Sequence, residues 1–200
     1  MKTFNTAQQQ LDNYRQAKRL FWDKVYTEGE LSLYSREKIV KKAHRLVNIE
    51  HVYPMSWVTH AVGCGDRDTC RRYSDLFNQI EADIHNMYPA RQDLNYLRGS
   101  LSFGMIAGEE RNFSDFDFEV DMQKRVIEPT LASRGNIARS MLYMADAYDL
   151  NIFTRQRKLL KSWHEQDPPS EREQRRNDLI EQVQGNRNHF IDYPDDVYYL

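Results

Sequence analysis

Apolar residues recur at intervals of three and four along much of the chain, the spacing that places them on one face of an α-helix. A clear example is the series Tyr73, Leu76, Phe77, Ile80 and Ile84. Polar residues fill the intervening positions, so each helix is expected to bury one side and expose the other. The spacing and the capping residues predict helices over residues 6–26, 36–45, 73–84, 133–148, 154–163 and 170–185.

Several predicted helices have recognisable ends. Thr6 is a candidate N-cap of the first helix, and Ser35 is a candidate N-cap of the second. The second helix is rich in basic residues, which are typical either of a solvated face or of a surface that contacts phosphate. Ser170 and Glu173 have the spacing of a capping box. Because Pro89 cannot continue a helix, Asn86 is expected in or just after the last turn of the 73–84 helix.

Strand signals are few and short. Residues 46–52 form a mostly apolar run, and apolar and acidic residues alternate over 116–122, with Val126 and Ile127 as a hairpin partner. Residues 91–112 are rich in glycine, serine and charge, and are expected to be mainly loop. Strands and helices do not alternate regularly, so a parallel sheet is not expected. The predicted fold class is α+β, mainly helical with small antiparallel β elements.

Composition favours an ordinary globular protein. The 200 residues are 40% hydrophobic and 29% charged, enough for one domain with its own core. The formal net charge of −2 gives no overall attraction to nucleic acid, so any phosphate-binding surface has to be a local patch. No apolar run approaches the roughly 18 residues that span a bilayer. We therefore expect no membrane association, and the absence of a heptad pattern favours a monomer.

The start of the chain bears on its location. Residues 1–6 contain a lysine, but no hydrophobic region of a signal peptide follows them. We expect either a protein that stays in the cytoplasm or a mature exported chain with an added start methionine.

Two segments carry residues suited to metal-assisted hydrolysis. Glu50 and His51 end the predicted strand at 46–52, and adjacent strand residues point to opposite faces. Glu50 can thus hold a hard cation such as Mg²⁺ while His51 acts as a general base on water. Asn86 offers an amide oxygen as a second ligand. Glu81 and His85 share a helical face nearby, and are expected to support these groups without binding the cation directly.

Two other interpretations stay open at this point. Cys64 and Cys70 can form one disulfide, remain free thiols, or bind zinc together with His60 as part of a structural zinc protein, although the spacing does not match a zinc finger. A catalytically inert binding module with this fold is the other alternative.

Longer motifs raise the specificity of the catalytic interpretation. They are residues 50–54 (Glu-His-Val-Tyr-Pro), 63–70 (Gly-Cys-Gly-Asp-Arg-Asp-Thr-Cys), 81–91, 98–100, 128–129, 134–139 and 183–188. In this order they resemble the bacterial endonuclease I family, which comprises periplasmic or secreted non-specific nucleases with a ββα-metal (His-Me finger) site. The resemblance covers residues 36–194, so residues 1–35 form a helical extension and 195–200 a tail of one endonuclease I-like domain.

The resemblance implies a role for several residues. His51 matches the family's general base, Glu50 and Asn86 match its metal ligands, and Arg67 matches an arginine that contacts the cleaved phosphate. The residues Asn95, Arg98 and Arg91 are expected near the backbone of bound nucleic acid.

The resemblance also implies an activity and a location. Family members hydrolyse DNA, and often RNA too, to 5′-phosphate ends with Mg²⁺, while Mn²⁺ or Ca²⁺ can occupy the same site. The expected location is periplasmic or extracellular. Better-known members have cysteines near the N-terminus, which residues 31–35 lack. A bridge between Cys64 and Cys70 would hold Arg67 in place.

Overall fold

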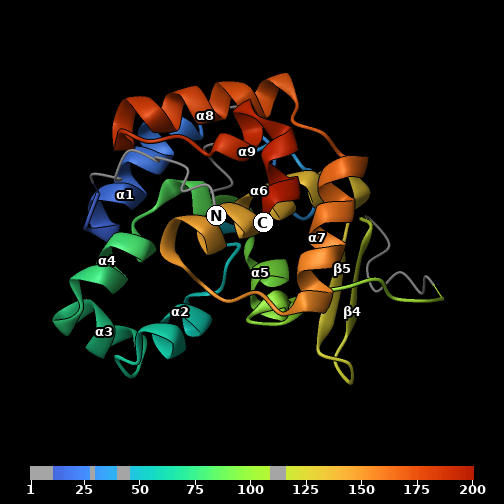
Figure 1. Ribbon diagram of the computed structural model, residues 1–200, viewed down its shortest axis with the longest axis horizontal. Helices are drawn as coiled ribbons and strands as arrows, with labels where there is room; N and C mark the ends of the chain where they lie inside the picture. The colour runs from blue at the N-terminus through green and yellow to red at the C-terminus, as the bar shows by residue number, and fades with distance from the viewer. Residues whose placement is uncertain (1–10, 28–29, 40–45, 109–115) are drawn as a thin grey trace.

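One connected apolar core runs through the part of the chain that the structure describes. The computed structural model describes residues 11–27, 30–39, 46–108 and 116–200 (Figure 1). Buried aromatic side chains in the core come from segments far apart in the sequence, among them Phe21, Phe77, Phe118, Trp163 and Phe190.

The helices and strands follow one another along the chain in a mixed order. They are α1 (Tyr14–Leu20), η1 (Phe21–Val25), β1 (Val47–His51), α2 (Met55–Val62), α3 (Arg67–Tyr73), α4 (Asp75–Glu81), η3 (Ile84–Asn86), β2 (Met87–Arg91), α5 (Gln92–Arg98), β3 (Ser102–Phe103), β4 (Phe118–Asp121), β5 (Val126–Pro129), α6 (Leu131–Tyr148), α7 (Thr154–Gln166), α8 (Glu171–Gln184), α9 (His189–Asp192) and η4 (Pro194–Tyr199).

Helix α6 lies at the centre of the molecule, with α8 and α9 on one side and α5 on the other (Figure 1). Most of its side chains are buried, as its mixture of small and apolar residues allows. A Cβ atom at Gly135 would lie 2.0 Å from the backbone oxygen of Asp167, just past α7. Glycine is therefore required where α6 passes the end of α7.

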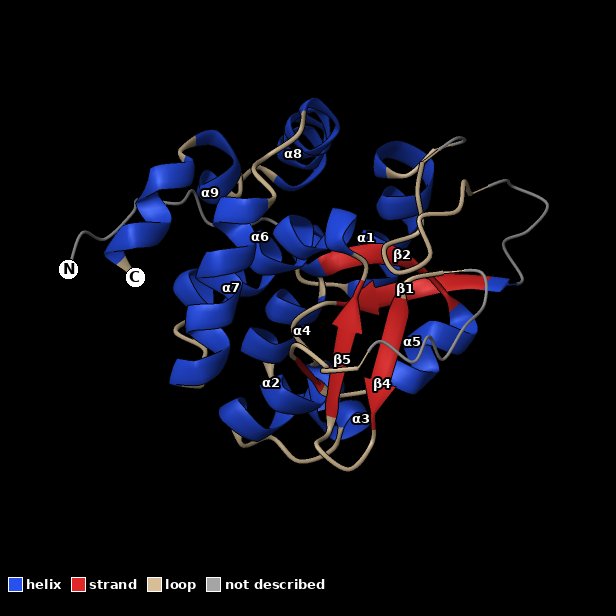
Figure 2. Cartoon of the chain, turned by 90° about the vertical axis from the view of Figure 1, so that its right-hand side faces the viewer, coloured by secondary structure: helices blue, strands red, loops and turns tan. Residues whose placement is uncertain are grey.

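Two small sheets lie on the side opposite α8 and α9 (Figure 2). In the first, β1 and β2 are antiparallel, and their register places Glu50 opposite Tyr88 and His51 opposite Met87. The second has the order β3-β5-β4: β4 and β5 are antiparallel, while β3 runs parallel to β5 over two residues. The α+β class with small antiparallel elements is thus confirmed, with one short parallel pair that the sequence pattern did not predict.

The sequence pattern was right about the C-terminal half. The helices at 154–163 and 170–185 are α7 and α8, and the Ser170 hydroxyl accepts the Glu173 N–H as expected for an N-cap. The predicted helix at 133–148 begins two residues earlier, because Ser133 is buried and its hydroxyl donates to the Leu33 carbonyl instead of capping.

Several predictions for the N-terminal half were wrong. The 73–84 helix is instead α3 and α4, separated at Ser74, whose hydroxyl caps α4. Helix α4 ends at Glu81, so Glu81 and His85 do not share a helical face. Pro89 does not follow a helix but lies inside β2. Residues 92–98, expected to be loop, form α5, which buries two side chains, Leu94 and Arg98, and so shows no apolar periodicity.

The two predicted N-terminal helices differ as well. Helix α1 begins at Tyr14 with Asn13 as its N-cap, and continues as the π-helix η1, whereas Thr6 lies outside the described residues. Residues 36–39 are not helical, because Lys38 forms a β-bridge with Leu31. The remainder of the predicted 36–45 helix, residues 40–45, lies outside the described residues.

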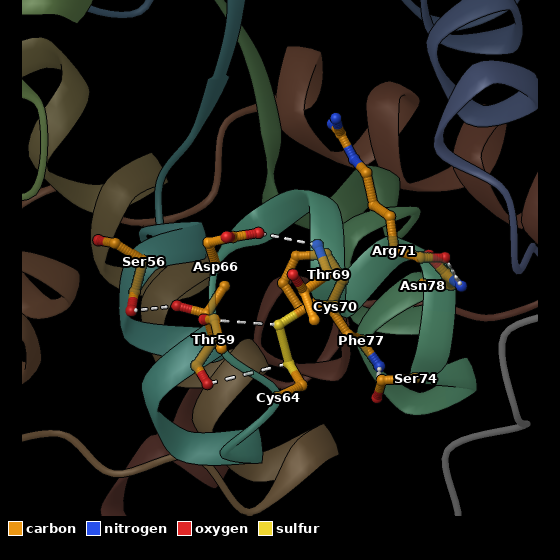
Figure 3. The surroundings of a disulfide bond; sticks show 11 residues. Ser56, Thr59, Cys64, Asp66, Thr69, Cys70, Arg71, Ser74, Phe77 and Asn78 are labelled. Carbon is orange, nitrogen blue, oxygen red and sulfur yellow. Dashed lines mark hydrogen bonds between the residues drawn. A yellow bond between two sulfur atoms is a disulfide. The ribbon is translucent and has the colours of Figure 1, made fainter.

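A disulfide joins Cys64 to Cys70 between α2 and α3 (Figure 3). Helix α2 ends at Gly63, which adopts a left-handed conformation with φ of 69°, and α3 begins after Asp66, whose carboxylate accepts the Thr69 N–H at 2.8 Å. The bridge thus closes the turn between the two helices. In the described part of the chain, no helix is long and apolar enough to span a membrane.

A largely buried polar cluster connects η3 with α6 and α8. The Asp83 carboxylate accepts hydroxyl hydrogen bonds from Tyr143 and Tyr148 at 2.8 and 2.7 Å, and a further bond from the Gln184 amide. The His85 ring packs edge-to-face with that of Tyr143, and its Nε2 donates to the Asn186 carbonyl at 3.2 Å. Burial lowers the pKa of His85 to about 4, so this imidazole is neutral in the folded protein.

Acid is therefore expected to destabilise the protein through His85. Its pKa is about 6.5 when unfolded and about 4 when folded. Below pH 6.5 the unfolded state binds a proton that the folded state does not, so stability is lost between pH 6.5 and 4, by about 3 kcal/mol in total.

Urea unfolding at several pH values, compared with His85→Gln, measures this loss. The variant should lose less stability than wild type between pH 6.5 and 4, because one proton uptake is removed. An identical pH dependence for the two proteins would contradict the prediction. The exposed His60 offers a matched control in His60→Gln.

Loss of the disulfide should lower the free energy of unfolding. In the chain-entropy treatment a closed loop of this length contributes about 2 kcal/mol. The double variant Cys64→Ala/Cys70→Ala should show this loss in urea unfolding, and a reductant should destabilise wild type but leave the variant unchanged. Equal stability of wild type with and without reductant would contradict the prediction.

Candidate functional site: a cavity beside the first sheet

A cavity of about 430 Å³ opens where β1, α2, α3 and α5 meet. Polar and charged residues form a large part of its lining, including Glu50, His51, Arg67, Asn95 and Arg98. The two strands and the helix that follows them set this arrangement. Because β2 runs antiparallel to β1 and leads directly into α5, α5 lies against both strands beside the cavity (Figure 2).

His51 lies at the end of β1 and is buried. Its Nε2 atom is 3.1 Å from the backbone oxygen of Glu81. A carbonyl oxygen accepts hydrogen bonds and cannot donate them, so Nε2 carries the proton and Nδ1 has a free lone pair. Burial, followed by the nearby positive charge of Arg67, lowers the pKa of His51 to about 4. The imidazole is therefore neutral near pH 7 and able to accept a proton.

Glu50 is also buried, on the neighbouring position of β1. Its Oε1 atom accepts the Tyr34 hydroxyl at 2.8 Å and lies 2.9 Å from Nη1 of Arg98. Burial raises the pKa of the Glu50 carboxyl, and the charge of Arg98 counteracts part of that rise. Within the described residues no hydrogen bond ends on Oε2, so one carboxylate oxygen is available to a ligand.

Asn95 presents an amide oxygen to the same cavity from α5. Its Nδ2 atom donates to Oδ1 of Asn48 at 2.7 Å and to the Ile49 carbonyl at 3.2 Å. These bonds fix the orientation of the amide and use only its nitrogen. Among the residues that the structure describes, none donates to Oδ1 of Asn95. The available oxygens of Glu50 and Asn95 are hard donors, which fits Mg²⁺ better than a softer metal.

Glu81 links His51 to two arginines. Its carboxylate is fully buried, and it binds Nε of Arg67 at 2.5 Å and Nε of Arg71 at 2.7 Å. Its backbone oxygen, as described above, accepts from His51. Two guanidinium groups thus share the Glu81 carboxylate, and Arg71 also lies 3.6 Å from the exposed carboxylate of Asp68. The Arg67 side chain is 42% exposed, which leaves it accessible to an anionic substrate.

Asn86 is not part of the cavity. Its side chain is fully buried, where Oδ1 accepts the Tyr53 N–H at 2.7 Å and Nδ2 donates to the Tyr53 carbonyl at 3.0 Å. Both ends of the amide are thus occupied by the backbone just after β1. The amide oxygen that the sequence led us to expect from Asn86 is provided at the cavity by Asn95.

The other predicted site residues divide into two groups. Arg98 reaches the cavity, where it is 1% exposed and donates to the carbonyls of His51 and Val52, so it holds the end of β1 in place. His85 belongs to the separate buried cluster, and Arg91 pairs with Asp93 at 2.7 Å on another surface. Sequence reasoning also missed Tyr34, and no local motif marks that tyrosine.

The disulfide bears on the zinc alternative. Both sulfur atoms of Cys64 and Cys70 are engaged in the bridge, so neither is available as a thiolate ligand with His60. Within the described residues, no group of three or more histidine, cysteine or acidic side chains has the arrangement of a metal site. A metal site formed by one carboxylate and one amide contains fewer than three such side chains.

Comparison with known proteins places this cavity in context. An extracellular deoxyribonuclease of Aeromonas hydrophila is 32% identical over 206 residues, which cover 96% of this chain and 89% of that protein. A periplasmic deoxyribonuclease of the same organism is 35% identical over 76% of this chain and 66% of its own length. An extracellular ribonuclease of Bacillus subtilis is 31% identical over 56% of this chain and 44% of its own length.

The family described as Endonuclease I matches residues 3–195, nearly the whole chain. This match includes the cavity residues and both sheets, together with α1, which the sequence had suggested was an extension outside the family-like core. The protein therefore belongs to the Endonuclease I family and is a nuclease, a hydrolase of phosphodiester bonds in nucleic acid.

Proposed function

We propose that the protein is a Mg²⁺-dependent, sequence-non-specific endonuclease that cleaves DNA, and RNA as a second substrate, to leave 5′-phosphate ends. The observation that carries this proposal is the neutral His51 imidazole beside the available oxygens of Glu50 and Asn95. The names of the relatives, deoxyribonucleases and a ribonuclease, support both substrates. The β1, β2 and α5 arrangement is proposed to be the ββα-metal (His-Me finger) site.

Glu50 and Asn95 would hold the cation. Mg²⁺ keeps several waters and needs few protein ligands, so one carboxylate and one amide oxygen are sufficient beside a substrate phosphate. When bound, the ion would polarise the scissile phosphate and stabilise the leaving oxygen. Arg98 holds the Glu50 carboxylate in place at 2.9 Å, and Asn48 does the same for the Asn95 amide. The ligands are thus oriented before substrate arrives.

His51 would act as the general base. Its protonated Nε2 is held by the Glu81 carbonyl, so Nδ1 is the atom that removes a proton from the attacking water. Arg67 would bind the phosphate and offset the negative charge that grows in the transition state, a contribution of a few kcal/mol in comparable sites. All of these groups would contact phosphate or water, and none would contact the edge of a base. The proposed cleavage is therefore independent of the nucleotide sequence.

We further propose that the protein acts outside the cytoplasm. The relatives named above are extracellular or periplasmic, and the disulfide between Cys64 and Cys70 is typical of oxidising compartments.

Replacing the base tests the mechanism. His51→Ala should lower plasmid nicking in Mg²⁺ by about 10²- to 10⁴-fold, the usual contribution of a general base, while DNA binding and folding persist. His60→Ala, on the exposed side of α2, is the matched control and should keep wild-type activity. EDTA should abolish cleavage by wild type and the control alike. Nicking by His51→Ala at a rate close to wild type would refute the role of His51.

The two asparagines give a direct test of the metal ligands. Asn95→Ala should raise the Mg²⁺ concentration needed for half-maximal cleavage by at least about tenfold, because it removes a proposed ligand. Asn86→Ala should leave this requirement unchanged, but lower stability by about 1–3 kcal/mol because it strands buried backbone groups of Tyr53. The opposite result, a raised requirement in Asn86→Ala alone, would restore Asn86 as the ligand.

A further inference from the structure

The ring of Tyr14, in helix α1, packs against the imidazole of His51, the proposed general base. The ring of Tyr14 lies 5.5 Å from that of His51, centroid to centroid, with an interplanar angle of 43°. The two residues are far apart in the sequence, and Tyr14 belongs to the segment that sequence analysis assigned to an extension. The contact makes that segment part of the site.

The same ring contacts the arginines that bind Glu81. The guanidinium carbons of Arg67 and Arg71 lie 5.7 and 5.3 Å from the Tyr14 ring centroid, within the range of cation–π attraction. Tyr14 therefore touches the proposed base and the proposed phosphate-binding arginine at once. Glu81 also contacts both His51 and Arg67, so these two residues are connected by Glu81 and by the Tyr14 ring.

The backbone of α1 holds Tyr14 firmly. The Asn13 side chain caps the helix by accepting the N–H groups of Arg15 and Gln16. One turn later Ala17 is fully buried, and Phe21 anchors the following η1 in the core. In Figure 1, α1 lies next to α4, the helix that ends at Glu81. The ring is thus attached to a fixed support.

His51 needs a second contact to fix its orientation. One hydrogen bond, from Nε2 to the Glu81 carbonyl, holds one atom of the imidazole but allows the ring plane to tilt about that bond. Nδ1 lies across the ring from this bond, so a tilt moves the basic lone pair away from the water. A displacement of about 1 Å in such a group can cost on the order of 100-fold in rate.

We propose that Tyr14 is a positioning residue of the nuclease site, whose ring fixes the plane of the His51 imidazole and the approach of Arg67. The inference rests on the proposed function of His51. The aromatic ring is the part that acts, since none of the hydrogen bonds among the described residues uses the Tyr14 hydroxyl. Phenylalanine should therefore replace Tyr14, whereas an aliphatic side chain should not.

The test compares Tyr14→Leu with Tyr14→Phe in steady-state DNA cleavage at saturating Mg²⁺. Tyr14→Leu should lower kcat by about 10- to 100-fold with KM close to wild type, because orientation affects the chemical step more than binding. Tyr14→Phe should keep kcat near wild type. Tyr73→Leu is the matched control, since Tyr73 is 75% exposed and contacts Arg72 instead.

NMR gives a readout that is independent of activity. In wild type, ring protons of Tyr14 and His51 should show a nuclear Overhauser effect, and this measurement needs no variant. The His51 ring-proton shifts should change in Tyr14→Leu and stay the same in Tyr14→Phe, because ring current requires the aromatic ring.

Several results would overturn the inference. They are a normal kcat in Tyr14→Leu, an effect confined to KM, an equal loss in Tyr14→Phe, or no Tyr14–His51 effect in wild type. A failure of the proposed function looks different, because wild type would then not cleave DNA or His51→Ala would cleave it normally.

Discussion

The arrangement of His51 and Arg67 at the cavity depends on the way Glu81 is bound. Its carboxylate lies fully out of water at the end of α4, where it would be strongly unfavourable without its two arginine partners. Its backbone oxygen fixes the protonated nitrogen of His51. One residue therefore sets the tautomer of His51 and the position of Arg67. The sequence suggested that Glu81 supports the site or forms a salt bridge, and its contacts are with His51, Arg67 and Arg71.

A second constraint acts from the other side of the strand. Arg98 is almost completely buried and donates to the carbonyls of His51 and Val52 while it faces the Glu50 carboxylate. The buried pair is thus enclosed by strand backbone, which orients Glu50 before any ligand arrives. Desolvation at this end of β1 also keeps His51 neutral. Burial favours the uncharged form of both side chains, and the charge of Arg98 opposes this effect at Glu50.

Glu50, His51 and Arg67, which the sequence singled out through motifs that resemble a known family, all line one cavity. Asn86 does not line it and Asn95 does, although the two side chains are chemically identical. The two asparagines differ in their hydrogen bonds. The oxygen and the nitrogen of the Asn86 amide both bond to the backbone of Tyr53, whereas only the nitrogen of the Asn95 amide forms a hydrogen bond within the described residues. That distinction needs the β1–β2 register, which brings the start of α5 alongside Val47.

The fold class was predicted correctly, and the helix predictions that failed did so for the same kind of reason. Helices α7 and α8 carry their signals locally, in caps and in apolar periodicity, and were predicted well. Helix α5 buries just two side chains, against β2, which directly precedes it, and β1, which comes much earlier in the chain, so local periodicity gives no sign of it. Tyr14 and Tyr34 contact His51 and Glu50 through tertiary packing, which no local pattern around either tyrosine indicates.

The most direct test of the account is a crystal structure of the protein with Mn²⁺, located by its anomalous scattering. The account predicts one strong peak in the cavity beside His51, about 2–2.5 Å from a carboxylate oxygen of Glu50 and from the amide oxygen of Asn95. A peak bound by Asn86, or a bound ion elsewhere with the Glu50–Asn95 position filled by protein, would contradict it.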